Sequence, residues 1–133
     1  METINIGVDL HGVLNKDEAT IKWFMETLPK LRQRNVKIIV VSGPSQEEIH
    51  CELMELGYKQ GRHFDKIRSV VDFLKEKKVK MWQDSNLNWW ASDVDWWSSK
   101  ALIATEENLF IMVDDKEKYS KYFKKTNTRF ILL

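Results

Sequence analysis

Residues 4–14 read INIGVDLHGVL, an apolar and β-branched run that stops at a carboxylate, Asp9, followed by a His-Gly pair. Apolar residues alternate with Asn5 and Gly7 along its first half, and this pattern predicts a β-strand. Gly12 loosens the backbone just beyond the strand. Ligands of open α/β sheets bind at the carboxyl ends of strands. Asp9 is therefore the residue for which the rest of the chain is expected to supply partners.

Four more short apolar runs predict strands, with helices between them. The strands are expected at 36–41, 79–82, 109–113 and 129–133, and the helices from Asp17, from Ser45, from Asp65, from Asp95 or Ser98, and over 116–123. Alternating strands and helices indicate βαβ units with right-handed crossovers and a parallel sheet. We therefore expect one α/β domain over residues 1–133, a Rossmann-like three-layer sandwich around a mainly parallel sheet of about five strands.

The composition is that of an ordinary globular protein. Of the 133 residues, 31% are charged and 43% are apolar, and the net charge is +1, so the total gives no reason to expect a nucleic acid or an anionic membrane as partner. The single cysteine, Cys51, excludes an intrachain disulfide and fits a reducing compartment. No apolar run approaches the roughly 20 residues of a spanning helix, and no secretory leader is evident. We expect a cytoplasmic protein.

Three predicted strands end in residues that can do chemistry. Asp9 with His11 follows the first, Ser42-Gly43 follows the second, and Asp114-Asp115 follows the strand at 109–113, while Lys100 lies in the helix before it. In a parallel sheet these strand ends share one edge, so carboxylates, a hydroxyl and an ammonium are expected to converge there. Because carboxylates repel one another, their cluster implies a cation, and oxygen ligands suit Mg²⁺.

The same residues suit a phosphate substrate. The Ser42 hydroxyl, the Gly43 backbone N–H and the Lys100 ammonium can hold phosphate oxygens. An aspartate can act as a covalent nucleophile and form an aspartyl-phosphate. A metal ion and a lysine would offset the charge of the transferred group. The pattern therefore favours phosphoryl chemistry at the strand ends.

Taken in order, these segments resemble the four motifs of the haloacid dehalogenase (HAD) superfamily of phosphohydrolases. The resemblance spans nearly the whole chain and rests on Asp9-Leu10-His11-Gly12-Val13, Val41-Ser42-Gly43, Lys100 and Val113-Asp114-Asp115. It implies a Mg²⁺-dependent phosphatase with a HAD-like core, and the chain is too short for the large cap domain of many members. A small, open site would admit a phosphorylated small molecule, a nucleotide or a nucleic-acid end.

The resemblance also implies a role for each residue. Asp9 matches the nucleophile, Ser42 and Gly43 match the phosphate-binding motif, and Lys100 matches the cationic stabiliser. Asp114 and Asp115 match the acidic motif that holds Mg²⁺ together with Asp9 and the backbone carbonyl two residues later, here that of His11. Asp115 has an alternative role as the cap of the next helix, and the lysines at 77, 78 and 80 are alternatives to Lys100.

His11 departs from the family pattern, because most HAD phosphatases carry a second aspartate at this position. That aspartate protonates the leaving oxygen and then activates the hydrolytic water. Histidine, with an unperturbed pKa of about 6.5, can do the same work. The alternative is a catalytically weakened HAD-like binding protein that engages a protein or nucleotide partner.

Five of the six tryptophans fall within residues 82–97. Three interpretations of this Trp-rich segment remain open: core packing at the sheet edge, a wall of the substrate entrance on which a base or sugar stacks, and a partner surface. The basic run over 116–125 is expected to be a solvated helix face, with phosphate contact as the alternative.

Overall fold

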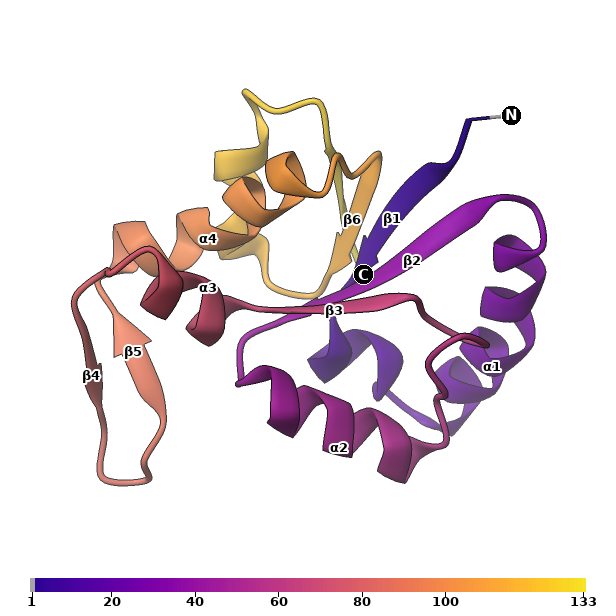
Figure 1. Ribbon diagram of the computed structural model, residues 1–133, viewed down its shortest axis with the longest axis horizontal. Helices are drawn as coiled ribbons and strands as arrows, with labels where there is room; N and C mark the ends of the chain where they lie inside the picture. Colours follow the sequence, from indigo (N-terminus) through magenta and orange to yellow (C-terminus); the bar gives the residue numbers. More distant parts are fainter. Residues whose placement is uncertain (1) are drawn as a thin grey trace.

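The computed structural model describes residues 2–133 and contains an α/β three-layer fold (Figure 1). A parallel five-stranded sheet forms the middle layer, in the order β3-β2-β1-β6-β7. Its strands are β1 (Ile4–Val8), β2 (Val36–Ser42), β3 (Lys66–Ser69), β6 (Ile111–Asp114) and β7 (Arg129–Leu132). The predicted Rossmann-like architecture is confirmed.

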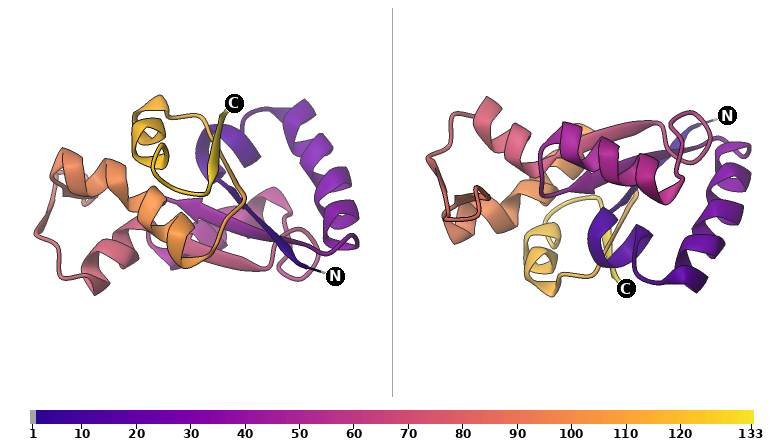
Figure 2. Two further views of the ribbon diagram at one scale, coloured as in Figure 1. Left: turned by 90° about the horizontal axis from the view of Figure 1, so that it is seen from above. Right: turned by 90° about the horizontal axis from the view of Figure 1, so that it is seen from below.

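Helices cover both faces of the sheet. The helices α1 (Glu18–Arg32) and α2 (Gln46–Leu56) pack on one face, and α3 (Val70–Glu76), α4 (Asp93–Glu106) and the 3₁₀ helix η2 (Glu117–Phe123) pack on the other (Figure 2). In β2, Ile38 and Val40 join the first core while Ile39 and Val41 join the second. This alternation explains why residues 38–41 are all apolar, as expected of a parallel strand covered on both sides.

The register brings three strand ends together. Val8, the last residue of β1, pairs with Val40 of β2 and Val113 of β6. The backbone N–H of Asp9 then donates to the Val113 carbonyl at 2.9 Å. Asp9 therefore leaves the sheet between β2 and β6. Beyond it, residues 10–14 form the short turn η1 (Leu10–Leu14), in which His11 and Gly12 have non-helical backbone angles.

One strand of the sheet differs from the prediction. Residues 66–69 form the edge strand β3, where the pattern predicted the first turn of a helix, and α3 begins only after Ser69 caps it. Ile67 and Ser69 are buried, while Lys66 and Arg68 alternate with them and reach Glu107. A four-residue strand with this alternation is too short to be told from a helix start by period alone.

The predicted strand at 79–82 does not belong to the sheet. It corresponds to β4 (Met81–Gln83), which pairs antiparallel with β5 (Trp89–Ala91) in a separate hairpin that stands away from the sheet (Figure 1). Residues 84–95 contain the hairpin turn, β5 and the start of α4 (Asp93–Glu106). Ser92 caps α4 by accepting a hydrogen bond from the Asp95 N–H at 3.3 Å, so the helix begins earlier than predicted.

The start of α2 agrees with the prediction of a helix from Ser45. Ser45 caps α2 and accepts from the Glu48 N–H, and Gly57 ends this helix in the left-handed conformation. Pro29 lies inside α1 without ending it. Across residues 2–133, no helix has the length and apolar character that crossing a membrane requires.

Candidate active site

Three charged side chains meet at the carboxyl ends of β1 and β6. The Lys100 Nζ, delivered by α4, lies 2.6 Å from Oδ2 of Asp114 and 3.3 Å from Oδ1 of Asp9. All three residues are buried. Backbone N–H groups hold the carboxylates in place, since Leu10 donates to Asp9 at 2.8 Å and Lys116 donates to Asp114 at 3.0 Å. The sequence prediction that Lys100 joins these aspartates therefore agrees with the geometry.

The ionisation of this cluster follows from burial and charge. Burial alone would lower the pKa of Lys100, but the charges of Asp9 and Asp114 raise it above its usual range, so the ammonium stays protonated. Burial raises the pKa of Asp114 to about 6, with the charge of Asp9 acting in the same direction and Lys100 opposing them. Asp114 is thus still mainly ionised at neutral pH, and one cation faces more than one anion.

Asp115 completes an acidic cluster. One carboxylate oxygen from each of Asp9, Asp114 and Asp115 lies within 4.8 Å of the others. The Oδ1 atom of Asp115 is buried and has no hydrogen-bond partner among the described residues. A buried carboxylate oxygen without a partner is costly, and an ion would satisfy it. Three carboxylates against one ammonium give a hard oxygen donor set with residual negative charge, which fits Mg²⁺.

Gly12 sets the position of Asp115. Its φ of +82° is in the left-handed region, and a Cβ atom there would overlap the Asp115 carboxylate. Both the backbone conformation and the close approach therefore require glycine. The sequence pattern indicated a loose backbone at Gly12 but gave no sign of its contact with a residue more than 100 positions away.

Ser42 provides a buried hydroxyl next to the cluster. It is the last residue of β2, is 1% exposed, and its Oγ atom has no hydrogen-bond partner among the described residues. Buried hydroxyls nearly always have a partner in native proteins, so an orphan at a strand end points to a ligand. Gly43 follows immediately and lies against the indole of Trp96, with the position of a Cβ atom 3.5 Å from Cζ2.

His11 lies at the exposed side of this site. Its Nε2 atom is 2.6 Å from Oε2 of Glu52, and the two side chains are 45% and 39% exposed. Glu52 is on α2, so the pair joins the turn after β1 to that helix. The interaction leaves Nδ1 as the ring nitrogen free for a substrate. Sequence reasoning missed Glu52, because a glutamate on a solvent-facing helix carries no distinguishing signal.

Tyr119 is a second residue that the sequence did not single out for the site. Its buried ring lies 4.4 Å from the Lys100 Nζ, measured to the ring centroid, and Trp97 packs edge-on against it. Burial raises the pKa of Tyr119 to about 12, while Lys100 acts to lower it. The aromatic face offers the lysine a cation–π contact in a dry environment. In the sequence, Tyr119 was only part of the apolar side of a polar helix.

Three other polar residues lie outside the cluster. Lys77 pairs with Glu106 at 3.1 Å and is not part of the cluster. His63 is buried and accepts a hydrogen bond from the Lys59 N–H, so it serves packing. Ser45 serves as the helix cap described above.

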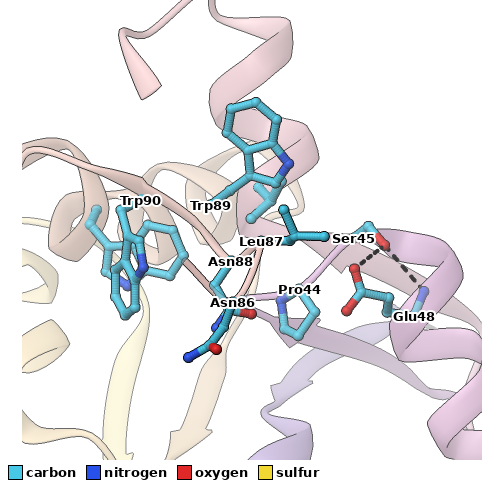
Figure 3. A pocket seen from close by; sticks show the side chains of 11 residues that line it. Pro44, Ser45, Glu48, Asn86, Leu87, Asn88, Trp89 and Trp90 are labelled. Carbon is cyan, nitrogen blue, oxygen red and sulfur yellow. Dashed lines mark hydrogen bonds between the residues drawn. The ribbon is translucent and has the colours of Figure 1, made fainter. Parts of the chain in front are cut away.

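The Trp-rich segment borders a pocket beside the site. Trp89, Trp90 and Trp96 line a cavity of about 470 Å³ together with Gly43 and Pro44 (Figure 3). Trp82 and Trp90 remain 49% and 41% exposed. Core packing therefore accounts for only part of this segment.

Comparison with known proteins supports the fold alone. No protein-family model matches the chain, and no curated protein matches it. The chain is similar to a solved structure of an uncharacterized protein from Corynebacterium glutamicum, with a TM-score of 0.59 and 15% sequence identity. The similarity covers 97% of this chain and 83% of that one. The likeness shows that this α/β arrangement recurs in a distant sequence.

Proposed function

We propose that this protein is a Mg²⁺-dependent phosphohydrolase that acts through an aspartyl-phosphate on Asp9. The observation that carries the proposal is the buried Lys100 ammonium between Asp9 and Asp114, 3.3 Å and 2.6 Å away. The orphan hydroxyl of Ser42 and the orphan oxygen of Asp115 support it. The resemblance to the HAD motifs assigns the same residues to the same chemistry.

The reaction would proceed in two steps. In the first, a carboxylate oxygen of Asp9 attacks phosphorus, the bond to the leaving oxygen breaks, and that oxygen receives a proton. In the second, water attacks the phosphorus of the acyl phosphate, releases inorganic phosphate and returns the Asp9 carboxylate. Lys100 and the Ser42 hydroxyl would hold the phosphoryl oxygens as charge shifts onto them.

The acidic cluster would hold the metal ion. Asp9, Asp114 and Asp115 are the side chains proposed to bind it, with the His11 carbonyl added by the resemblance. A bound Mg²⁺ would supply charge neutralisation for the phosphate. The Lys100 ammonium, 3.3 Å from Oδ1 of Asp9, would also offset the negative charge of the incoming phosphate.

His11 is proposed as the acid and base of both steps. Its free Nδ1 could give a proton to the leaving oxygen, and Glu52 at 2.6 Å would orient the ring, as carboxylates orient histidines in other active sites. The same contact favours the second candidate, a weakened HAD-like binding protein, if Glu52 keeps the imidazole away from the substrate. Turnover distinguishes the two.

The test is hydrolysis of a generic aryl phosphate with and without Mg²⁺. Wild type should release phosphate only with the metal, and Asp9→Asn should reduce the rate to background. Asp72→Asn, a change in the first turn of α3, serves as the matched aspartate control. An inactive wild type that becomes active as His11→Asp would identify a scaffold that has lost its acid–base residue. If neither wild type nor His11→Asp hydrolysed the ester or bound Mg²⁺, the catalytic proposal would be contradicted.

A further inference from the structure

A cavity beside Gly43 borders the candidate active site. It lies between the β4–β5 hairpin and the turn that leads into α2, with the Trp90 indole on one side and Ser45 and Glu48 on the other (Figure 3). Its volume of about 470 Å³ falls within the range of small-molecule sites, about 300–1,000 Å³. The space is therefore large enough for the organic part of a phosphate ester.

Two residues that line the cavity are close in sequence to residues of the candidate active site. Gly43, which lines it, directly follows Ser42, the proposed phosphate ligand. Trp96, which also lines it, precedes Lys100 by one turn of α4, so both side chains leave the same face of the helix. Gly43 lies beside Trp96, and a Cβ atom there would be in ordinary van der Waals contact with the indole, 3.5 Å from Cζ2. A phosphate bound at Ser42 would thus carry its substituent over Gly43 into the cavity.

The walls of the cavity select a flat, neutral group. Trp90 and Trp96 lie with ring centroids 5.4 Å apart and form one aromatic wall. The Trp90 ring is anchored by its Nε1–H, which donates to Asp84 at 2.9 Å. Aromatic walls of this kind stack nucleobases whatever the base. The side-chain amide of Asn86, at the hairpin turn, makes no hydrogen bond within residues 2–133 and can pair with a base edge.

The charge of the lining limits the number of phosphates. None of the described residues that line the cavity is a lysine or an arginine, whereas Glu48 contributes a carboxylate. One oxygen of Glu48 accepts from Ser45 at 3.0 Å, which leaves the other for a substrate hydroxyl. A second phosphate in this space would meet the Glu48 carboxylate, while the Lys75 ammonium nearby is engaged by the Trp89 ring, 4.1 Å from its centroid. The cavity therefore favours an ester with a single phosphate.

We propose that this cavity is the specificity pocket for a nucleoside monophosphate, with the base stacked on Trp90 and Trp96 and the sugar near Glu48. The inference rests on the phosphatase function proposed above, because it takes Ser42 as the phosphate end. The Trp-rich hairpin then acts as the wall of the substrate entrance.

The test compares adenosine monophosphate with ribose phosphate, which has the same phosphate and sugar but no base. Wild type should prefer adenosine monophosphate in kcat/KM by roughly tenfold or more, the expected effect of one stacked base. Trp90→Leu should remove most of this preference, because it should lower kcat/KM for adenosine monophosphate much more than kcat/KM for ribose phosphate. Trp23→Leu, which alters an exposed tryptophan on α1, should keep the preference.

Two further variants test the pocket independently of the folding of Trp90→Leu. Asn86→Ala leaves the hairpin contacts intact and should reduce the preference severalfold even if Trp90→Leu fails to fold. Glu48→Gln keeps the helix cap, since glutamine also completes a capping box, and should strengthen binding of adenosine diphosphate relative to the monophosphate. Equal rates for the two wild-type substrates, or an unchanged preference in both Trp90→Leu and Asn86→Ala, would overturn the pocket assignment.

Binding separates this inference from the function on which it rests. Calorimetry on Asp9→Asn with Mg²⁺ measures adenosine monophosphate affinity without turnover. Trp90-dependent binding with no hydrolysis by wild type would support the pocket and refute the phosphatase. Hydrolysis of both esters without a preference for the base would support the phosphatase and refute the pocket.

Discussion

The Lys100 Nζ and the Asp114 Oδ2 are 2.6 Å apart in a region closed to solvent, where the two side chains are 2% and 0% exposed. A buried ion pair adds little net stability because both charges lose their hydration. Removal of one partner is different, since the other charge is then stranded in the interior. The pair therefore makes stability and the proposed chemistry depend on the same lysine.

Lys100→Met should lower the free energy of unfolding by about 3–5 kcal/mol, the usual cost of breaking a buried pair. Urea denaturation measures this change. The double variant Lys100→Met/Asp114→Asn should recover a large part of the loss, because it removes the stranded charge as well. If Lys100→Met were as stable as wild type, the ammonium of Lys100 would not be stabilising the buried carboxylates.

Gly12→Ala should lower the stability of the fold more than an alanine at another glycine with a positive φ. Gly61 also has a positive φ, +87°, but a Cβ atom there meets nothing within 4 Å. Gly61→Ala should therefore cost only the backbone strain, about 1 kcal/mol. Gly12→Ala should cost more and also weaken Mg²⁺ binding, because the methyl group displaces Asp115. Thermal unfolding and metal titration of both variants measure the difference, and equal effects would contradict the Asp115 contact.

Asp65 should control part of the stability at acidic pH. Burial would raise the pKa of its carboxyl, but hydrogen bonds from Arg32 and from the Ile38 N–H outweigh burial and hold the pKa below its usual value. A lowered folded-state pKa gives stability that is present above the unfolded pKa of about 3.9 and is lost as pH falls through that value toward the folded pKa.

Asp65→Asn should therefore destabilise the protein by about 1.5–3 kcal/mol at neutral pH, the range for hydrogen bonds to charged groups. It should also flatten the loss of stability between about pH 5 and pH 3. Urea unfolding across this range compares it with wild type. A variant that keeps the wild-type pH profile would show that Asp65 is not the titrating group.

His11→Ala should lower kcat by roughly 10²–10⁴-fold, the typical contribution of a positioned acid or base. Mg²⁺ affinity should change little, because the side chain is not a proposed metal ligand. His50→Ala, on an exposed position of α2, is the matched control. Unchanged kcat in His11→Ala would remove the imidazole from the mechanism and leave only its backbone carbonyl as a proposed ligand.

The fold could be predicted where the burial of a segment determines its local pattern of apolar and polar residues. Strands covered on both faces, such as β2, are continuous apolar runs and were identified with nearly correct ends. The edge strand β3 was not, because it has only four residues and two of them, Lys66 and Arg68, are charged and pair with glutamates at the end of α4. The segment of β4 was correctly predicted to be extended, but it was assigned to the main sheet. In the structure it pairs with β5 in a separate hairpin.

The site was predictable where its residues directly follow strands. Asp9, Ser42 and Asp114 lie at strand ends that a parallel sheet must bring to one edge, and Lys100 was placed from its position before β6. Glu52 and Tyr119 could not be predicted, because their roles depend on contacts between segments that are distant in sequence. Such contacts arise from packing and leave no periodic trace in the sequence.

The most direct test of the central claim is to trap the phosphorylated aspartate. Borohydride reduces an aspartyl-phosphate to homoserine, and peptide mass spectrometry then locates the modified residue. Wild type quenched during turnover of an aryl phosphate with Mg²⁺ should carry homoserine at position 9, and samples without the metal should not. Continued turnover with an unmodified Asp9, or undiminished hydrolysis by Asp9→Asn, would contradict the account.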